Sequence, residues 1–160
     1  MKVLSVKNPN AYLIAFGIKD IENRNFKIEE GRELLIHVSG ENIYIRSIQD
    51  IIDMLPNGIE CEVEVEEKDD GIELSIVKGK RQLINKIVEM YNYAVDNGGM
   101  LEGKAIIAKI TVGEISEKSD SVWASNDSRY KWKIKKAELL EKPVRFVKGK
   151  LNLWEYDLNM

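Results

Sequence analysis

The last third of the chain constrains the fold most, because its apolar residues alternate with polar ones over long stretches. In residues 104–112 one face of an extended segment is fully apolar, and that face is formed by Ile106, Ala108, Ile110 and Val112. Residues 130–136 alternate in the same way, with large apolar residues on one face and lysines on the other. Such a pattern is typical of the wall of a sheet or barrel that encloses a core. The sequence therefore predicts long strands here.

A second alternating region lies in the middle of the chain. Residues 59–66 alternate apolar residues with glutamates, and residues 72–76 resume the alternation after the turn signal Asp69-Asp70-Gly71. The pattern indicates a half-buried hairpin with an acidic outer face. That face is most simply solvated, but it would also repel nucleic acid and orient it toward a basic surface, or bind a protein partner.

Three segments predict helices. Asn8-Pro9 is typical of a cap followed by proline at the first helical position, and residues 11–16 would form a short helix that Gly17 ends. Residues 46–55 have isoleucines and leucine at helical spacing, and residues 83–95 carry an apolar stripe that would pack on a core.

Length and composition limit the possible classes of protein. A chain of 160 residues with 44% hydrophobic residues has the size of one globular domain. No apolar run approaches the roughly 18 to 20 residues that cross a bilayer, and the start lacks the apolar region of a signal peptide, so we expect a cytoplasmic protein without membrane contact. Because Cys61 is the single cysteine and His37 the single histidine, an internal disulfide and a Cys/His zinc site are excluded. We expect no metal or other cofactor, and a structural, hydrogen-bonded role for His37, which would point toward a cleft or solvent.

The charge is unevenly distributed along the chain. The net charge is −3, yet residues 60–73 contain eight acidic residues against Lys68 alone. Residues 129–150 contain nine basic residues against Glu138 and Glu141. Because phosphate binding depends on a local basic surface and not on the total charge, the composition is compatible with a nucleic-acid ligand.

Gly17-Ile18-Lys19-Asp20-Ile21-Glu22-Asn23-Arg24 combines a hinge, an amine, carboxylates and a guanidinium within eight residues. In an extended segment Asp20, Glu22 and Arg24 share one face, with Lys19 entering from the hinge. Such a group suits anion binding or proton transfer. The alternative is an exposed edge strand with ordinary salt bridges, each contributing roughly 0 to 1 kcal/mol.

Gly17, Lys19, Glu22 and Arg24 fit the Gly-x-Lys-x-x-Glu-x-Arg pattern of the ASCH family, which has a PUA-like fold. The flanks resemble the family in the same order, at Leu4–Pro9, Leu34–Ser39, Leu101–Ala108, Tyr130–Ile134 and Val147–Glu155. This resemblance implies an α+β fold: a small PUA-like β-barrel of about five or six mainly antiparallel strands with flanking helices. It also implies a single domain over residues 1–160, with the acidic hairpin and helix as an insertion at about residues 41–99, where the match is weakest.

The chain departs from the family pattern at two places. Asn10 stands where many members carry tryptophan, and Asn25-Phe26 replaces a common aromatic after the arginine. Both changes fall at the presumed mouth of the family's cleft, so the ligand would differ from that of better-known members.

Members of the family are thought to bind RNA or nucleotides, and some related domains are hydrolases. The resemblance therefore implies a cleft for RNA, a nucleotide or a nucleoside, built on Gly17, Lys19, Glu22 and Arg24. Lys19 and Arg24 would engage phosphate or a carbonyl, and Glu22 would accept hydrogen bonds.

The alternative is a metal-independent hydrolase, either a ribonuclease or an amidohydrolase acting on a modified nucleoside. Lys19, with a pKa lowered by desolvation, or Glu22 would then be the general base. A hydroxyl nucleophile would come from the polar segment 116–129, whose candidates are Ser119, Ser121, Ser125 and Ser128.

Two further features have two interpretations each. Trp123, a lone tryptophan in a polar segment, would either anchor a loop to the core or stack on a base. Lys131, Lys133 and Lys135 form a row that would contact the backbone phosphates of a nucleic acid or only keep a strand edge solvated.

Overall fold

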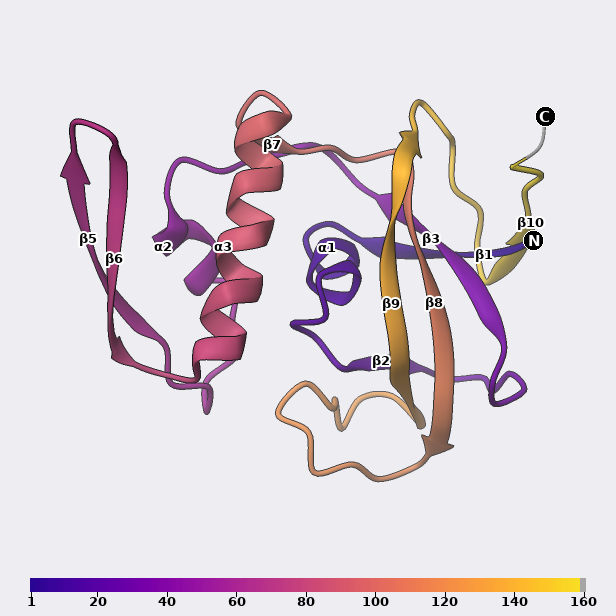
Figure 1. Cartoon of the computed structure of the whole chain (residues 1–160). Coiled ribbons are helices and arrows are strands. Elements are labelled where there is room, and N and C mark those ends of the chain that lie inside the picture. The colour runs from indigo at the N-terminus through magenta and orange to yellow at the C-terminus, as the bar shows by residue number, and fades with distance from the viewer. Residues whose placement is uncertain (159–160) are drawn as a thin grey trace.

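The computed structural model describes residues 1–158, and its largest element is a curved six-stranded sheet with strand order β10-β1-β3-β8-β9-β2 (Figure 1). Its strands are β1 (Lys2–Lys7), β2 (Ile21–Arg24), β3 (Glu33–Ser39), β8 (Ala105–Ser116), β9 (Tyr130–Val144) and β10 (Leu153–Glu155). β1 and β3 pair in parallel and the other neighbours pair antiparallel. The predicted α+β class and mainly antiparallel pairing are thus confirmed.

The sheet is open and combines parallel with antiparallel pairs. It is therefore compatible with a barrel-like fold but differs from the barrel that the sequence predicted. β10 and β2 are the two edges of the sheet, with three and four residues. β1 and β3 can be parallel because residues 8–32 between them include a helix and β2, which is enough chain for a crossover. A closed antiparallel barrel is therefore not what these strands form.

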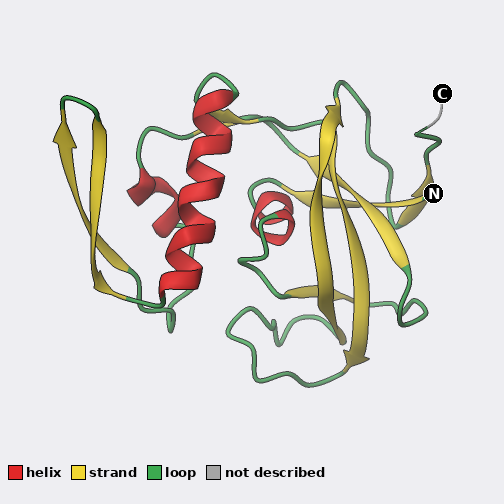
Figure 2. Cartoon of the chain, viewed as in Figure 1, coloured by secondary structure: helices red, strands yellow, loops and turns green. Residues whose placement is uncertain are grey.

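Three helices lie between the six-stranded sheet and a separate hairpin in residues 1–158 (Figure 2). They are α1 (Asn10–Ala15), α2 (Ile48–Ile52) and α3 (Arg81–Asp96), and a small pair of strands, β4 (Ile43–Tyr44) and β7 (Met100–Leu101), connects this region to the sheet. None of these helices has both the length and the apolar composition needed to cross a membrane. α1 begins at Asn10 and not at Pro9, the predicted first helical position. The Asn8 side chain does not cap it and instead donates to the Glu41 and Leu101 carbonyls, at 3.0 and 2.9 Å.

The predicted acidic hairpin is present as β5 (Glu62–Lys68) and β6 (Gly71–Lys78), at the end of the molecule farthest from the six-stranded sheet (Figure 1). Its apolar face is less covered than the alternation suggested. Val63 and Leu74 are partly buried. Val65 and Ile72, which lie nearer the tip, have about half of their surface exposed and count as exposed residues. The reason is that the hairpin leans away from α2 and α3 toward its tip (Figure 1), so no helix covers the tip.

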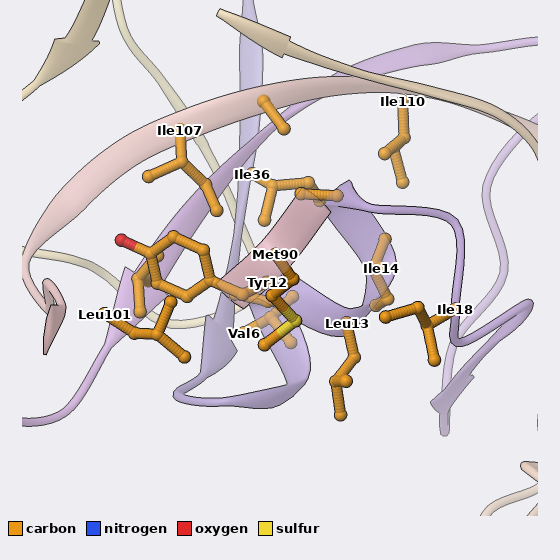
Figure 3. Packing of buried hydrophobic residues seen from close by; sticks show 14 of the residues in the cluster. Val6, Tyr12, Leu13, Ile14, Ile18, Ile36, Met90, Leu101, Ile107 and Ile110 are labelled. Carbon is orange, nitrogen blue, oxygen red and sulfur yellow. The ribbon is translucent and has the colours of Figure 1, made fainter. Parts of the chain in front are cut away.

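The main core lies between the sheet and the helices (Figure 3). Tyr12, Leu13 and Ile14 of α1 are fully buried, and Met90 of α3 packs next to Tyr12 and Leu13. Trp132 of β9 is also fully buried, and its indole N–H donates to the Phe26 carbonyl at 3.0 Å. α1 is thus enclosed by the sheet on one side and by α3 on the other.

The apolar face predicted for residues 104–112 is interrupted in the structure. Ala108, Ile110 and Val112 face the main core, but Ile106 packs in a second cluster with Val3, Leu35 and Trp154. The β8–β9 register shifts between Ile106 and Ala108, and such a bulge changes which side of the sheet the following side chains face. Both sides of this part of β8 are therefore buried.

Candidate functional site

A cleft of about 1220 Å³ opens beside the Gly17–Arg24 segment. One wall is formed by β1, β2 and β3, and the other by residues 146–152, a connection between β9 and β10 that we call the strap. Every residue of the strap lines the cleft. Asn10, Asn25 and Phe26 line it as well.

Gly17 sets the position of Lys19. Its φ of +73° is the left-handed conformation that glycine adopts without strain, and it ends α1 as predicted. After this turn the N–H groups of Ile18 and Lys19 both donate to the Leu13 carbonyl, at 2.9 and 3.0 Å. The Lys19 side chain then lies at the cleft with only 7% of its surface exposed. Gly17 itself does not line the cleft, so among the described residues its part in the site is to shape the turn.

Glu22 and Arg24 share the cleft face of β2, as the alternation predicts. Arg24 Nη2 lies 3.1 Å from Glu22 Oε2 and also donates to the Ser5 carbonyl at 2.7 Å. Glu22 is buried, with 5% exposed. Asp20 does not join this face, because β2 begins only at Ile21, and its carboxylate instead accepts a hydrogen bond from Ser121 Oγ at 2.6 Å.

The Lys19 amine lies in an unusual environment for a lysine. Its pKa is lowered, mainly because burial removes water from the charged form, and Arg24 lowers it further while Glu22 raises it. The amine also lies 5.8 Å from the centre of the Trp123 ring, within the range of a cation–π contact. Lys19 is therefore an amine in a defined position that loses its proton at a lower pH than a surface lysine does.

The segment between β8 and β9 is attached to β2 by Asn23, a residue that the motif does not include. Asn23 Nδ2 donates to the Trp123 carbonyl at 3.0 Å, and its Oδ1 accepts from the Ser125 N–H at 2.9 Å. Trp123 packs against the main core, which supports the anchor interpretation, and it is not among the described residues that line the cleft. Of the four candidate serines, Ser128 alone lines the cleft.

His37 and Ser5, two cleft residues that carried no predicted functional role, form a hydrogen-bonded chain in which His37 is buried and Ser5 half-buried. His37 Nε2 lies 2.6 Å from the Val147 carbonyl and Nδ1 lies 3.0 Å from Ser5 Oγ. Because a carbonyl only accepts, Nε2 carries the proton, and in the neutral ring Nδ1 accepts from the Ser5 hydroxyl. Trp154 Nε1 donates to the same hydroxyl oxygen at 3.2 Å. The structural, hydrogen-bonded role predicted for His37 agrees with these contacts.

The strap lies directly on this chain of hydrogen bonds. A Cβ atom added at Gly149 would lie 2.6 Å from His37 Cε1 and 2.7 Å from Ser5 Oγ, so only glycine fits there. The sequence signal for Ser5 and His37 is a single polar residue within an apolar run, Val3–Val6 in β1 and Leu34–Val38 in β3.

The predicted lysine row does not form one exposed surface. Lys131 is buried, with 7% exposed, and its amine donates to the Ser128 carbonyl. Lys133 and Lys135 are exposed, but none of the three is among the described residues that line the cleft. The reason is that Lys131 lies opposite Asn23 in the pairing of β9 with β2. It is covered there by the segment between β8 and β9, which Asn23 holds.

Basic residues dominate the cleft. Among residues 1–158, its charged lining consists of one acidic residue, Glu22, and six basic ones: Lys7, Lys19, Arg24, Lys104, Lys148 and Lys150. In a chain of net charge −3, this concentration favours an anionic ligand. Within the described residues no group of three or more His, Cys, Asp or Glu side chains is placed to hold a metal ion.

No family model and no curated protein sequence matches this chain.

The burial of neutral His37 predicts a pH dependence of stability. Desolvation lowers its pKa in the folded state, although the Val147 carbonyl acts in the opposite direction. His37 of the unfolded chain therefore takes up a proton near pH 6.5, whereas His37 of the folded protein does so only at a lower pH. The free energy of unfolding should consequently fall as the pH decreases from about 7 toward 5. Urea denaturation at several pH values measures this. His37→Gln should be less stable at pH 7.5 but show a flatter dependence over this range, and an equal slope in both proteins would contradict the assignment.

Proposed function

We propose that the cleft binds RNA through its phosphates and one or more of its bases, as a domain of the PUA-like ASCH type. The observation that carries this proposal is the set of six basic residues against one acidic residue in the cleft. The Gly-x-Lys-x-x-Glu-x-Arg pattern and the curved, mainly antiparallel sheet support the same conclusion.

In this proposal the cleft residues have different roles. Lys19 and Arg24 hold a phosphate or a base carbonyl at the floor, where burial strengthens their interaction with an anion. Glu22 orients Arg24 and accepts hydrogen bonds from a base edge. The exposed lysines of the strap, Lys148 and Lys150, contact phosphates nearer the solvent.

Lys19→Ala tests the proposal directly. Removing a buried, charge-assisted contact should weaken binding of a labelled single-stranded RNA by roughly 10- to 100-fold in a fluorescence anisotropy titration. The matched control is Lys118→Ala, which removes an exposed lysine outside the cleft lining and should leave the affinity unchanged. RNA binding that is equal in Lys19→Ala and wild type, with both proteins folded, would contradict the proposal.

A second candidate, the metal-independent hydrolase, is favoured by the buried position of the Lys19 amine at the cleft, where its lowered pKa leaves more of it in the neutral form that a general base requires. The same titration, carried out in EDTA and sampled over time on a denaturing gel, detects cleavage. Under this hypothesis Glu22→Gln should abolish turnover but retain binding, with a modified nucleoside as the second substrate to test. Loss of binding and turnover together in Glu22→Gln would count against a role for Glu22 as acid or base.

The salt dependence of binding separates the two sets of lysines. Each phosphate neutralised on a single strand contributes about −0.7 to the slope of log affinity against log salt concentration. Replacing Lys148 and Lys150 by alanine should therefore reduce the slope by about 1.4. The same double replacement at Lys133 and Lys135, which do not line the cleft, is the charge-matched control and should leave the slope unchanged. If the replacements at Lys133 and Lys135 reduced the slope and those at Lys148 and Lys150 did not, the phosphate contacts would lie on β9.

A further inference from the structure

We propose that Phe146 is a platform for base stacking at the rim of the cleft, and that the ligand is a single-stranded oligonucleotide longer than one nucleotide. This inference rests on the proposed function and specifies its ligand.

The first observation is the exposure of two large apolar side chains on the strap. Phe146 and Leu151 are each 90% exposed, and both line the cleft. An exposed aromatic ring contributes almost nothing to the core, so folding does not account for it. In proteins that bind single strands, aromatic rings beside a basic groove stack on successive bases.

The second observation is the backbone conformation around the cleft. In residues 1–158 three non-glycine residues have a positive φ, namely Lys104 (58°), Phe146 (59°) and Asn152 (56°), and all three line the cleft. A bulky residue in this region is strained, and such strain persists where surrounding contacts impose it, often at functional sites.

The contacts that impose this conformation lie on both sides of Phe146. Before it, Arg145 Nε lies 2.8 Å from Glu102 Oε2, a carboxylate whose side chain is only 11% exposed. After it, the Val147 N–H donates to the Lys104 carbonyl at 2.8 Å, and the Val147 carbonyl accepts from His37. The backbone that carries the exposed ring is thus held in place, so stacking of a base would order the side-chain torsions of Phe146 and not the strap.

The size and charge of the cleft indicate an extended ligand. Its volume of about 1220 Å³ exceeds the roughly 300 to 1000 Å³ of typical small-molecule sites. Phe146 is followed on the strap by Lys148 and Lys150, so a stacking surface and phosphate contacts lie along one segment. A duplex keeps its bases stacked on one another, and therefore a single strand is the form that can use this ring.

The test compares Phe146→Asn with wild type on two ligands of equal length, a single-stranded RNA and an abasic oligomer. Asparagine tolerates a positive φ, so this variant removes the ring and keeps the strap conformation. RNA affinity should fall about tenfold while affinity for the abasic oligomer stays unchanged, and Phe146→Trp should retain RNA affinity. Tyr44→Ala, which removes an aromatic side chain that is 68% exposed and does not line the cleft, is the matched control and should bind RNA like wild type.

Every other outcome contradicts the stacking role of Phe146, the single-stranded ligand or the proposed function. Lys19-dependent RNA binding that Phe146→Asn does not weaken would overturn the stacking role and leave the proposed function standing. An equal loss for RNA and the abasic oligomer would show that the variant disturbs the strap and would also overturn it. If a mononucleotide or a duplex binds wild type as tightly as the single strand, the extended single-stranded ligand is wrong. If wild type binds no RNA, the proposed function fails and this inference fails with it.

Discussion

The geometry of the cleft depends on the hydrogen bond between His37 Nε2 and the Val147 carbonyl. It joins β3 to the strap, and through Ser5 the same polar chain reaches β1 and the indole of Trp154 on β10. A buried polar group left without a partner is costly, so the strap cannot move away from the sheet without uncovering a histidine. The Ser5 carbonyl in turn accepts a hydrogen bond from Arg24, so Ser5 links this network to the basic floor of the cleft. A hydrogen bond between the sheet and the strap thereby helps to determine the shape of the cleft.

Local patterns in the sequence predicted most of the individual elements. The hairpin, α3, the long strand β8 and the shared face of Glu22 and Arg24 follow from alternation or helical spacing, which record the environment of neighbouring residues. These patterns do not show which strands pair. The parallel pairing of β1 with β3 and the bulge at Ile106 arise from packing between distant segments, and neither was predicted from the sequence.

The same limit applies to the candidate site. The motif supplied Lys19, Glu22 and Arg24, but the opposite wall is formed by a strap that lies more than 120 residues later in the chain. Lys131 shows the converse problem: its alternation with Tyr130 and Trp132 predicted exposure, yet contact with a neighbouring segment buries it. Residues 129–150 contribute Lys148 and Lys150 to the cleft lining and not the lysines of β9, because the net charge of a segment does not show where each side chain points.

The β5–β6 hairpin has a further consequence for how such a chain tolerates change. Glu62 and Lys78 pair at its base, so the two ends of the hairpin lie side by side. Gly79 packs against the Glu60 carbonyl, where an added Cβ would lie 2.8 Å from the oxygen, and this contact closes the base independently of the tip. Val63 and Leu74 pack against the main core, but the part of the hairpin beyond them can therefore be shortened, lengthened or exchanged at little cost to the core. It is a natural place for related chains to differ in length, and a practical one for attaching a label without approaching the cleft.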